Sequence, residues 1–131
     1  MGCGCPNCKN SKLENTIYEM LTEANIKFEY RKRSLEWLES LELDFYIPEL
    51  KIAIECQGLQ HFQPVDFSGK GEEWAKQQFD KAIERDNRKR ILCAKHGVKL
   101  LYYSDLNIEY PYNVYTNTQL LLNEIMIKHY D

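Results

Sequence analysis

Residues 41–62 read LELDFYIPELKIAIECQGLQHF, and the alternation within this stretch decides the fold. Apolar and polar residues alternate over 41–47 and again over 52–57, which predicts two half-buried β-strands. The four residues between them begin with Pro48 and predict a tight turn, because proline pre-sets a turn dihedral and cannot donate to a central ladder. The stretch therefore predicts an antiparallel hairpin.

The register of this hairpin places two acids opposite each other. The apolar faces coincide only if Ile47 pairs with Ile52, and this register sets Asp44 across from Glu55 at roughly 5 Å. Like charges directly opposite destabilise a ladder, and each acid favours protonation unless a cation lies between them. A divalent metal resolves the conflict, and oxygen ligands suit Mg²⁺. The alternative is an exposed hairpin face with two solvated acids.

Composition indicates a single intracellular domain. The chain has 131 residues, enough for a real core, and no apolar run approaches the length of a membrane span. Its five cysteines are odd in number and unevenly placed, which favours a reducing cytoplasm over a secreted disulfide scaffold. The net charge of −3 does not by itself favour nucleic acid, but basic residues cluster over 27–33 and 81–95. The alternative for both clusters is a solvated helix face or strand edge.

Periodicity and capping signals predict an α/β fold in the order α-β-β-β-α-β-α, with a mixed sheet flanked by helices. Residues 11–131 form this domain, and residues 1–10 are irregular and cysteine-rich. Outside the hairpin, the expected elements are a helix over 11–24, a short strand around 28–30, a loop over 58–71, a helix from 72 to 97, a central strand over 98–103, a loop over 105–114 and a helix over 118–129.

His61 and Asp86 extend the hairpin into a candidate site. His61 follows the second strand, where its imidazole titrates near neutrality and can take a proton from water; alone, it is equally a surface loop histidine. Asp86 recurs at seven-residue spacing with Phe79 and Cys93 on the core-facing stripe of its helix, so we expect it to be largely buried and partnered. Its partner is either Arg90, one turn along, or His61.

Glu14 has two explanations. Ser11 to Glu14 forms a capping box, in which the glutamate returns to the backbone N–H of Ser11. That role accounts for Glu14 without any chemistry. The alternative is that the first helix brings Glu14 to the acid pair of the hairpin.

Taken together, these motifs resemble the very-short-patch-repair-like (Vsr-like) branch of the PD-(D/E)XK nuclease superfamily, which includes phage homing endonucleases with an E-D-x-H-D signature. The match covers nearly the whole chain in the correct order. The segments that carry it are Ser11 to Glu14, DFYIP at 44–48, IECQGLQH at 54–61 and DNRK at 86–89.

The resemblance implies a restriction-endonuclease-like core and a metal-dependent endonuclease that hydrolyses phosphodiester bonds of double-stranded DNA, with Mg²⁺ or Mn²⁺ as cofactor, in a bacterial or phage-encoded cytoplasmic protein. It assigns Asp44, Glu55 and the backbone of Cys56 to the metal. By the same carry-over, His61 is the general base and Asp86 orients it. Further roles fall to Glu14, which completes the acidic cluster, and to Arg85, Arg88 and Lys89, which contact DNA.

Gln57 departs from the family pattern. It occupies the position, two residues after the second acid, where the superfamily usually carries a lysine. An amide can orient water but cannot supply a cation. The sequence therefore keeps a second hypothesis, a catalytically inactive nuclease fold that acts as a nucleic-acid-binding module.

The N-terminal cysteines suggest a partial zinc knuckle. Cys5 and Cys8 are spaced as one half of such a site, and Cys3 could serve as a third ligand, but a complete site needs four. The missing half would lie upstream in a DNA-binding or zinc-finger segment. The alternatives are unpaired cysteines in a tail, or a zinc-ribbon protein whose activity lies elsewhere. Cys56 and Cys93 lie on apolar faces and are expected in the core.

Overall fold

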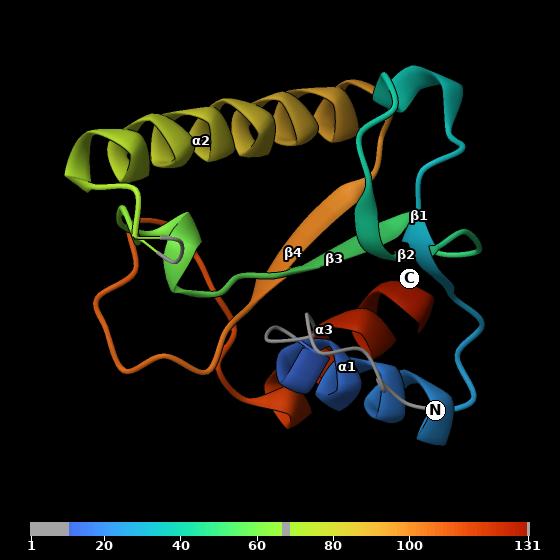
Figure 1. Ribbon diagram of the computed structural model, residues 1–131. Coiled ribbons are helices and arrows are strands. Elements are labelled where there is room, and N and C mark those ends of the chain that lie inside the picture. The colour runs from blue at the N-terminus through green and yellow to red at the C-terminus, as the bar shows by residue number, and fades with distance from the viewer. Residues whose placement is uncertain (1–10, 67–68, 131) are drawn as a thin grey trace.

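The protein folds as an α/β domain with a four-stranded mixed sheet, as the sequence predicts (Figure 1). The computed structural model describes residues 11–66 and 69–130. Two single-turn 3₁₀ helices, η1 and η2, were not expected, and η2 lies within the segment predicted as loop. The elements in chain order are α1 (Ser11–Glu23), β1 (Glu29–Lys32), η1 (Glu36–Leu38), β2 (Leu43–Ile47), β3 (Ile52–Cys56), η2 (Leu59–His61), α2 (Glu72–Lys95), β4 (Lys99–Tyr103) and α3 (Thr118–Tyr130).

Helices cover both faces of the sheet. The long helix α2 crosses one face, while α1 and α3 lie together against the other (Figure 1). Each face has its own apolar core, since alternate strand residues point to opposite sides. The core under α1 and α3 includes Ile17, Phe45 and Ile125, and the smaller core under α2 includes Leu92 and Cys93.

The predicted hairpin register is confirmed. The sheet order is β1-β2-β3-β4, in which β1, β2 and β3 are antiparallel and β4 runs parallel to β3. Ile47 pairs with Ile52 and Phe45 pairs with Ile54. The connecting turn is closed by the Leu50 N–H, which donates to the Ile47 carbonyl at 3.2 Å.

The expectation of a central strand over 98–103 is wrong, because β4 is an edge strand of the sheet. Its apolar composition has another cause. Leu101 and Tyr103 pack into the core under α1 and α3, whereas Val98 and Leu100 pack on the α2 side. A strand between helices on both faces is apolar throughout, whether it lies at the centre or at the edge.

No helix in the part of the chain that the structure describes is both long enough and apolar enough to cross a membrane.

Candidate active site

The pairing of β2 with β3 changes character beyond Phe45 and Ile54. There the Asp44 N–H donates to Glu55 Oε2 at 2.7 Å, and the Cys56 N–H donates to Asp44 Oδ2 at 2.8 Å. Each carboxylate therefore accepts a backbone N–H from the opposite strand. The two acids face one another across adjacent antiparallel strands, as the register predicted.

The negative charge of this acid pair is not fully balanced by nearby positive charge. Burial raises the pKa of Asp44 to about 8, and the nearby Glu55 carboxylate adds to the rise. Burial also raises the pKa of Glu55, whose side chain is only 3% exposed. The Cys56 and Asp44 N–H groups oppose these shifts without cancelling them. Two buried carboxylates in this state favour either a shared proton or a bound cation.

Lys89 supplies one cation to the pair. Its Nζ lies 2.7 Å from Glu55 Oε1, and its side chain is 14% exposed. Burial alone would lower the pKa of Lys89, but the Glu55 carboxylate more than offsets burial and the pKa is raised. Lys89, which the resemblance assigns to DNA contact, thus forms an ion pair within the site. Its spacing from Asp86, one helical turn, is the sequence signal for this placement.

Glu14 reaches the same cluster from α1. Its charge contributes to the raised pKa of Asp44, so α1 does bring it within electrostatic reach of the pair. Its Oε1 accepts a hydrogen bond from the Tyr30 hydroxyl and another from Arg31 Nη2 at 3.0 Å. Burial and the bond to Glu14 raise the pKa of Tyr30 to about 12. The capping-box alternative involves Ser11, whose side chain lies outside the described residues.

His61 and Asp86 are joined, as the sharper of the two sequence hypotheses predicted. His61 Nδ1 lies 2.9 Å from Asp86 Oδ2. Arg90 instead donates from Nη2 to Asn87 Oδ1 at 3.0 Å, so Asp86 pairs with the histidine. The Asp86 side chain is 16% exposed, and its partner His61 lies on η2. An ionised aspartate here accepts from Nδ1–H and leaves Nε2 as the basic nitrogen.

Gln57 lies just past β3 and is buried, with 1% exposure. Its Nε2 donates to the Tyr112 hydroxyl at 3.1 Å. Its Oε1 is buried and has no hydrogen-bond partner among the residues that the structure describes. An unpartnered buried acceptor is costly, so this oxygen suits an N–H or water donor. Tyr112 had no sequence signal, since its loop position is fixed only by the fold.

The remaining DNA-contact candidates lie on the outer surface of α2. Arg88 forms a bidentate ion pair with Glu39, in which Nε donates to Oε1 at 2.8 Å and Nη2 donates to Oε2. Both side chains of this pair are 49% exposed. Arg85 is exposed on the same helix. Neither arginine forms a hydrogen bond or ion pair with the acid pair in the part of the chain that the structure describes.

The oxygen atoms of Asp44 and Glu55 are of the type that binds Mg²⁺ or Mn²⁺, but their arrangement in this structure is not that of a metal site. Asp44, partly buried, and Glu55, buried, supply the carboxylate oxygens that a divalent ion prefers, and among the described residues only Glu55 of the two has a cationic side chain as a partner. However, both oxygens of Glu55 are engaged, by Lys89 and by the Asp44 N–H. Across residues 11–66 and 69–130, no group of three or more His, Cys, Asp or Glu side chains is arranged to hold a metal. The cysteines proposed for zinc, Cys3, Cys5 and Cys8, lie outside the described residues.

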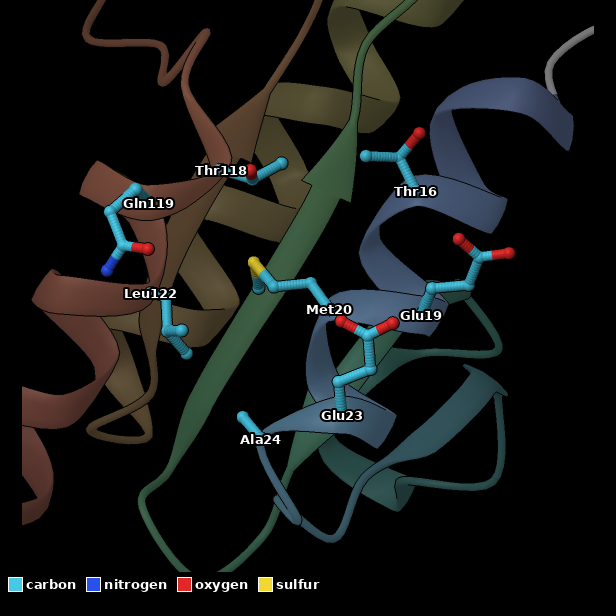
Figure 2. Close-up of a pocket in the computed structure, with 8 residues that line it drawn as sticks. All are labelled: Thr16, Glu19, Met20, Glu23, Ala24, Thr118, Gln119 and Leu122. Carbon is cyan, nitrogen blue, oxygen red and sulfur yellow. The ribbon is translucent and has the colours of Figure 1, made fainter.

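A separate hollow lies between α1 and α3, on the sheet face opposite α2 (Figure 2). It has a volume of about 340 Å³. Figure 2 shows Glu19 and Glu23 along the α1 side and Gln119 and Leu122 along the α3 side, with Met20 between them. Its lining contains no member of the acid pair or of the His61–Asp86 pair, so it belongs to a different surface.

Comparison with known proteins identifies two viral relatives. The uncharacterized protein 094L of Frog virus 3 (isolate Goorha) is 45% identical over 75 residues, which cover 57% of this chain and 42% of that protein. The uncharacterized protein 307L of Invertebrate iridescent virus 6 is 33% identical over 87 residues, which cover 66% and 38%. The chain thus spans about two fifths of the length of these curated relatives. No family model matches the chain.

Proposed function

We propose that this chain is a metal-dependent endonuclease that hydrolyses phosphodiester bonds in double-stranded DNA, in the manner of the Vsr-like branch of the PD-(D/E)XK nucleases that its motifs resemble. One observation carries the proposal. The buried Glu55 and the partly buried Asp44 face each other across the β2–β3 pair, and Lys89 forms an ion pair with Glu55. Negative charge that is only partly balanced, beside a paired histidine and aspartate, suits metal-assisted hydrolysis of a phosphodiester.

Asp44, Glu55 and the backbone of Cys56 would hold Mg²⁺ or Mn²⁺ in this function. When bound, the ion supplies Lewis-acid stabilisation of the charge that develops on the phosphate. Lys89 balances part of the negative charge of the pair through its ion pair with Glu55. Glu14 adds negative charge from α1 and so strengthens the preference for a cation.

His61 serves as the general base. Its Nδ1–H is held by Asp86, so Nε2 is free to take a proton from the attacking water. Asp86 fixes the ring orientation and stabilises the imidazolium that forms. Asp86 is thus a positioning residue, whereas His61 contacts the reacting water. Gln57 Oε1, for which the described residues supply no hydrogen-bond partner, would accept a hydrogen bond from that water.

DNA would approach along the α2 side of the sheet, where Arg85 and Arg88 are exposed and can contact backbone phosphates. The net charge of −3 over the whole chain makes these local charges important. A cytoplasmic location and an upstream DNA-binding segment remain part of the proposal. The greater length of the two viral relatives leaves room for further segments in those proteins.

A plasmid nicking assay tests the proposal. Supercoiled DNA is incubated with the chain in Mg²⁺ or Mn²⁺ and, in parallel, in EDTA. We expect nicked or linear product only with metal, and a loss on the order of a thousandfold for Asp44→Asn. Glu49→Gln, at an exposed position in the β2–β3 turn, is the matched control and should cut like wild type.

The same assay separates the competing function. DNA binding without cleavage in either metal would identify a catalytically inactive nuclease fold, which the glutamine at position 57 already suggests. Binding is measured on the same plasmid by gel shift in EDTA. Product that forms equally well in EDTA would contradict the metal-dependent mechanism.

A further inference from the structure

A second hollow adjoins the His61–Asp86 pair on the α2 side of the sheet. It has a volume of about 370 Å³, within the range of small-molecule sites. Asp86 belongs to both the pair and the hollow, so the two lie side by side. The lining residues are Ile83, Asp86, Asn87 and Arg90 from α2, with Tyr102 and Tyr112 opposite them.

Aromatic rings form one wall of this hollow. The Tyr102 and Tyr112 ring centroids lie 4.8 Å apart, and Phe62 packs behind Tyr112 at 5.8 Å. The Tyr112 hydroxyl is fixed by the bond from Gln57 Nε2. Burial raises the pKa of both tyrosines, so the rings stay neutral. Such a wall offers a face on which a planar ring can stack, and Ile83 supplies apolar surface from α2.

Two residues that carry hydrogen-bond donors, Asn87 and Arg90, lie on the α2 side of the hollow beside the Asp86 carboxylate, which is paired with His61. Arg90 Nη2 donates to Asn87 Oδ1 at 3.0 Å, which turns the Asn87 amide so that its NH₂ group is left to donate. The rest of the Arg90 guanidinium donates as well, since it has no acceptor atoms. Donors beside an aromatic wall match a base edge that carries two acceptors. Guanine presents such an edge in O6 and N7.

We propose that this hollow binds one unpaired nucleobase of the DNA, preferentially guanine, stacked against Tyr112 and bonded by Asn87 and Arg90. The inference rests on the proposed function, since it names the part of the substrate that lies next to the scissile phosphate. A base held here would be displaced from the duplex stack. Its phosphate would then be fixed beside His61.

The test is equilibrium binding in EDTA, where cleavage plays no part. A fluorescein-labelled pentadeoxynucleotide with a central dG is compared with the same strand carrying a central abasic site, by fluorescence anisotropy. We expect wild type to bind the dG strand about tenfold more tightly, as is typical of stacking on one aromatic side chain. Tyr112→Ala should remove this preference and Tyr112→Phe should keep it, because the ring remains.

Asn87→Ala provides an independent variant at an exposed position. It should lower the preference for central dG over central dT, while binding of the abasic strand is unchanged. Ile91→Ala, 50% exposed on the same helix and outside the hollow, is the control and should bind like wild type. Circular dichroism of each variant verifies the fold.

Equal affinity of wild type for the dG and abasic strands would overturn the inference, as would a preference that survives Tyr112→Ala. These outcomes are separable from those of the nicking assay. A chain that shows the base preference but never cuts would contradict the proposed function alone. A chain that cuts with Mg²⁺ but shows no base preference would contradict the nucleobase site alone.

Discussion

The β2–β3 hairpin has two different ends. At the turn end, here called the closed end, Ile47 pairs with Ile52 in the regular ladder of the two strands. At the other end, the open end, the Asp44 and Glu55 carboxylates accept hydrogen bonds from backbone N–H groups of the opposite strand. Both ends derive from one alternating pattern. The closed end buries apolar surface, while the open end buries charge that only partly finds a partner. The comparison shows apolar packing and buried charge divided along a single pair of strands.

The largest expected effect lies at the closed end. Phe45 is fully buried and pairs with Ile54, so Phe45→Ala should lower the free energy of unfolding by about 3–5 kcal/mol. Asp44→Asn, one residue along, should cost far less in EDTA, because it replaces an acid whose ionisation burial disfavours and keeps an oxygen for the Cys56 N–H. Urea unfolding measures both. Equal losses in the two variants would erase the division between the ends.

Lys89 offers the sharpest stability test of the open end. Lys89→Met should lower the free energy of unfolding by about 3 kcal/mol in EDTA, since it leaves Glu55 buried and unpaired. The matched control is Lys99→Met, which removes an exposed pair with Glu124 and should cost under about 1 kcal/mol. If the two variants unfold at the same urea concentration, the ion pair in the site contributes no more than a surface pair.

The rate of DNA cleavage by His61 variants tests the proposed catalytic role of the residues near the open end. His61→Ala should slow Mg²⁺-dependent nicking on the order of a hundredfold, and Asp86→Asn should slow it less because the ring remains. The comparison variant is His96→Ala, whose ring stacks on Trp37 at the C-terminal end of α2, and it should cut at the wild-type rate. Single-turnover rates distinguish the three. An unchanged rate in His61→Ala would end the general-base assignment.

Per pH unit, the smallest expected effect is a pH dependence of stability without metal. The pKa of Asp44 is about 8 in the fold against an ordinary value near 3.8, so the folded state holds a proton that the unfolded state has released. The free energy of unfolding should therefore fall as pH rises from about 4 to about 8, by at most about 1.4 kcal/mol per unit. Asp44→Asn should flatten this slope in urea titrations. An identical slope in both proteins would assign the dependence to other groups.

Much of the fold was predictable because alternation and capping are local. The hairpin register followed from the apolar faces, and it placed Asp44 opposite Glu55 correctly. The element order was also correct. The position of β4 was not, because an apolar strand reports burial on its faces and not the number of strands beside it.

The candidate site was predictable in part. A partner for Asp86 was expected because a carboxylate on a core-facing stripe needs one; of the two candidates, Arg90 and His61, the structure shows His61 at 2.9 Å. The partner of Lys89 was missed, since a helix pattern gives the side that a residue faces but not the strand that it meets. Tyr112 was missed for a similar reason, because its loop is placed only by tertiary packing.

Arg31 has a consequence for how this protein meets other chains. It lies within the edge strand β1 with a φ of 54°, in the left-handed region that residues with a side chain seldom adopt. Beside it, charged side chains occupy most of the strand, and at the opposite edge Tyr115 bridges to Tyr103 at the end of β4. An irregular, charged edge is a poor template for a further strand. The sheet is thereby protected at β1 against edge-to-edge aggregation.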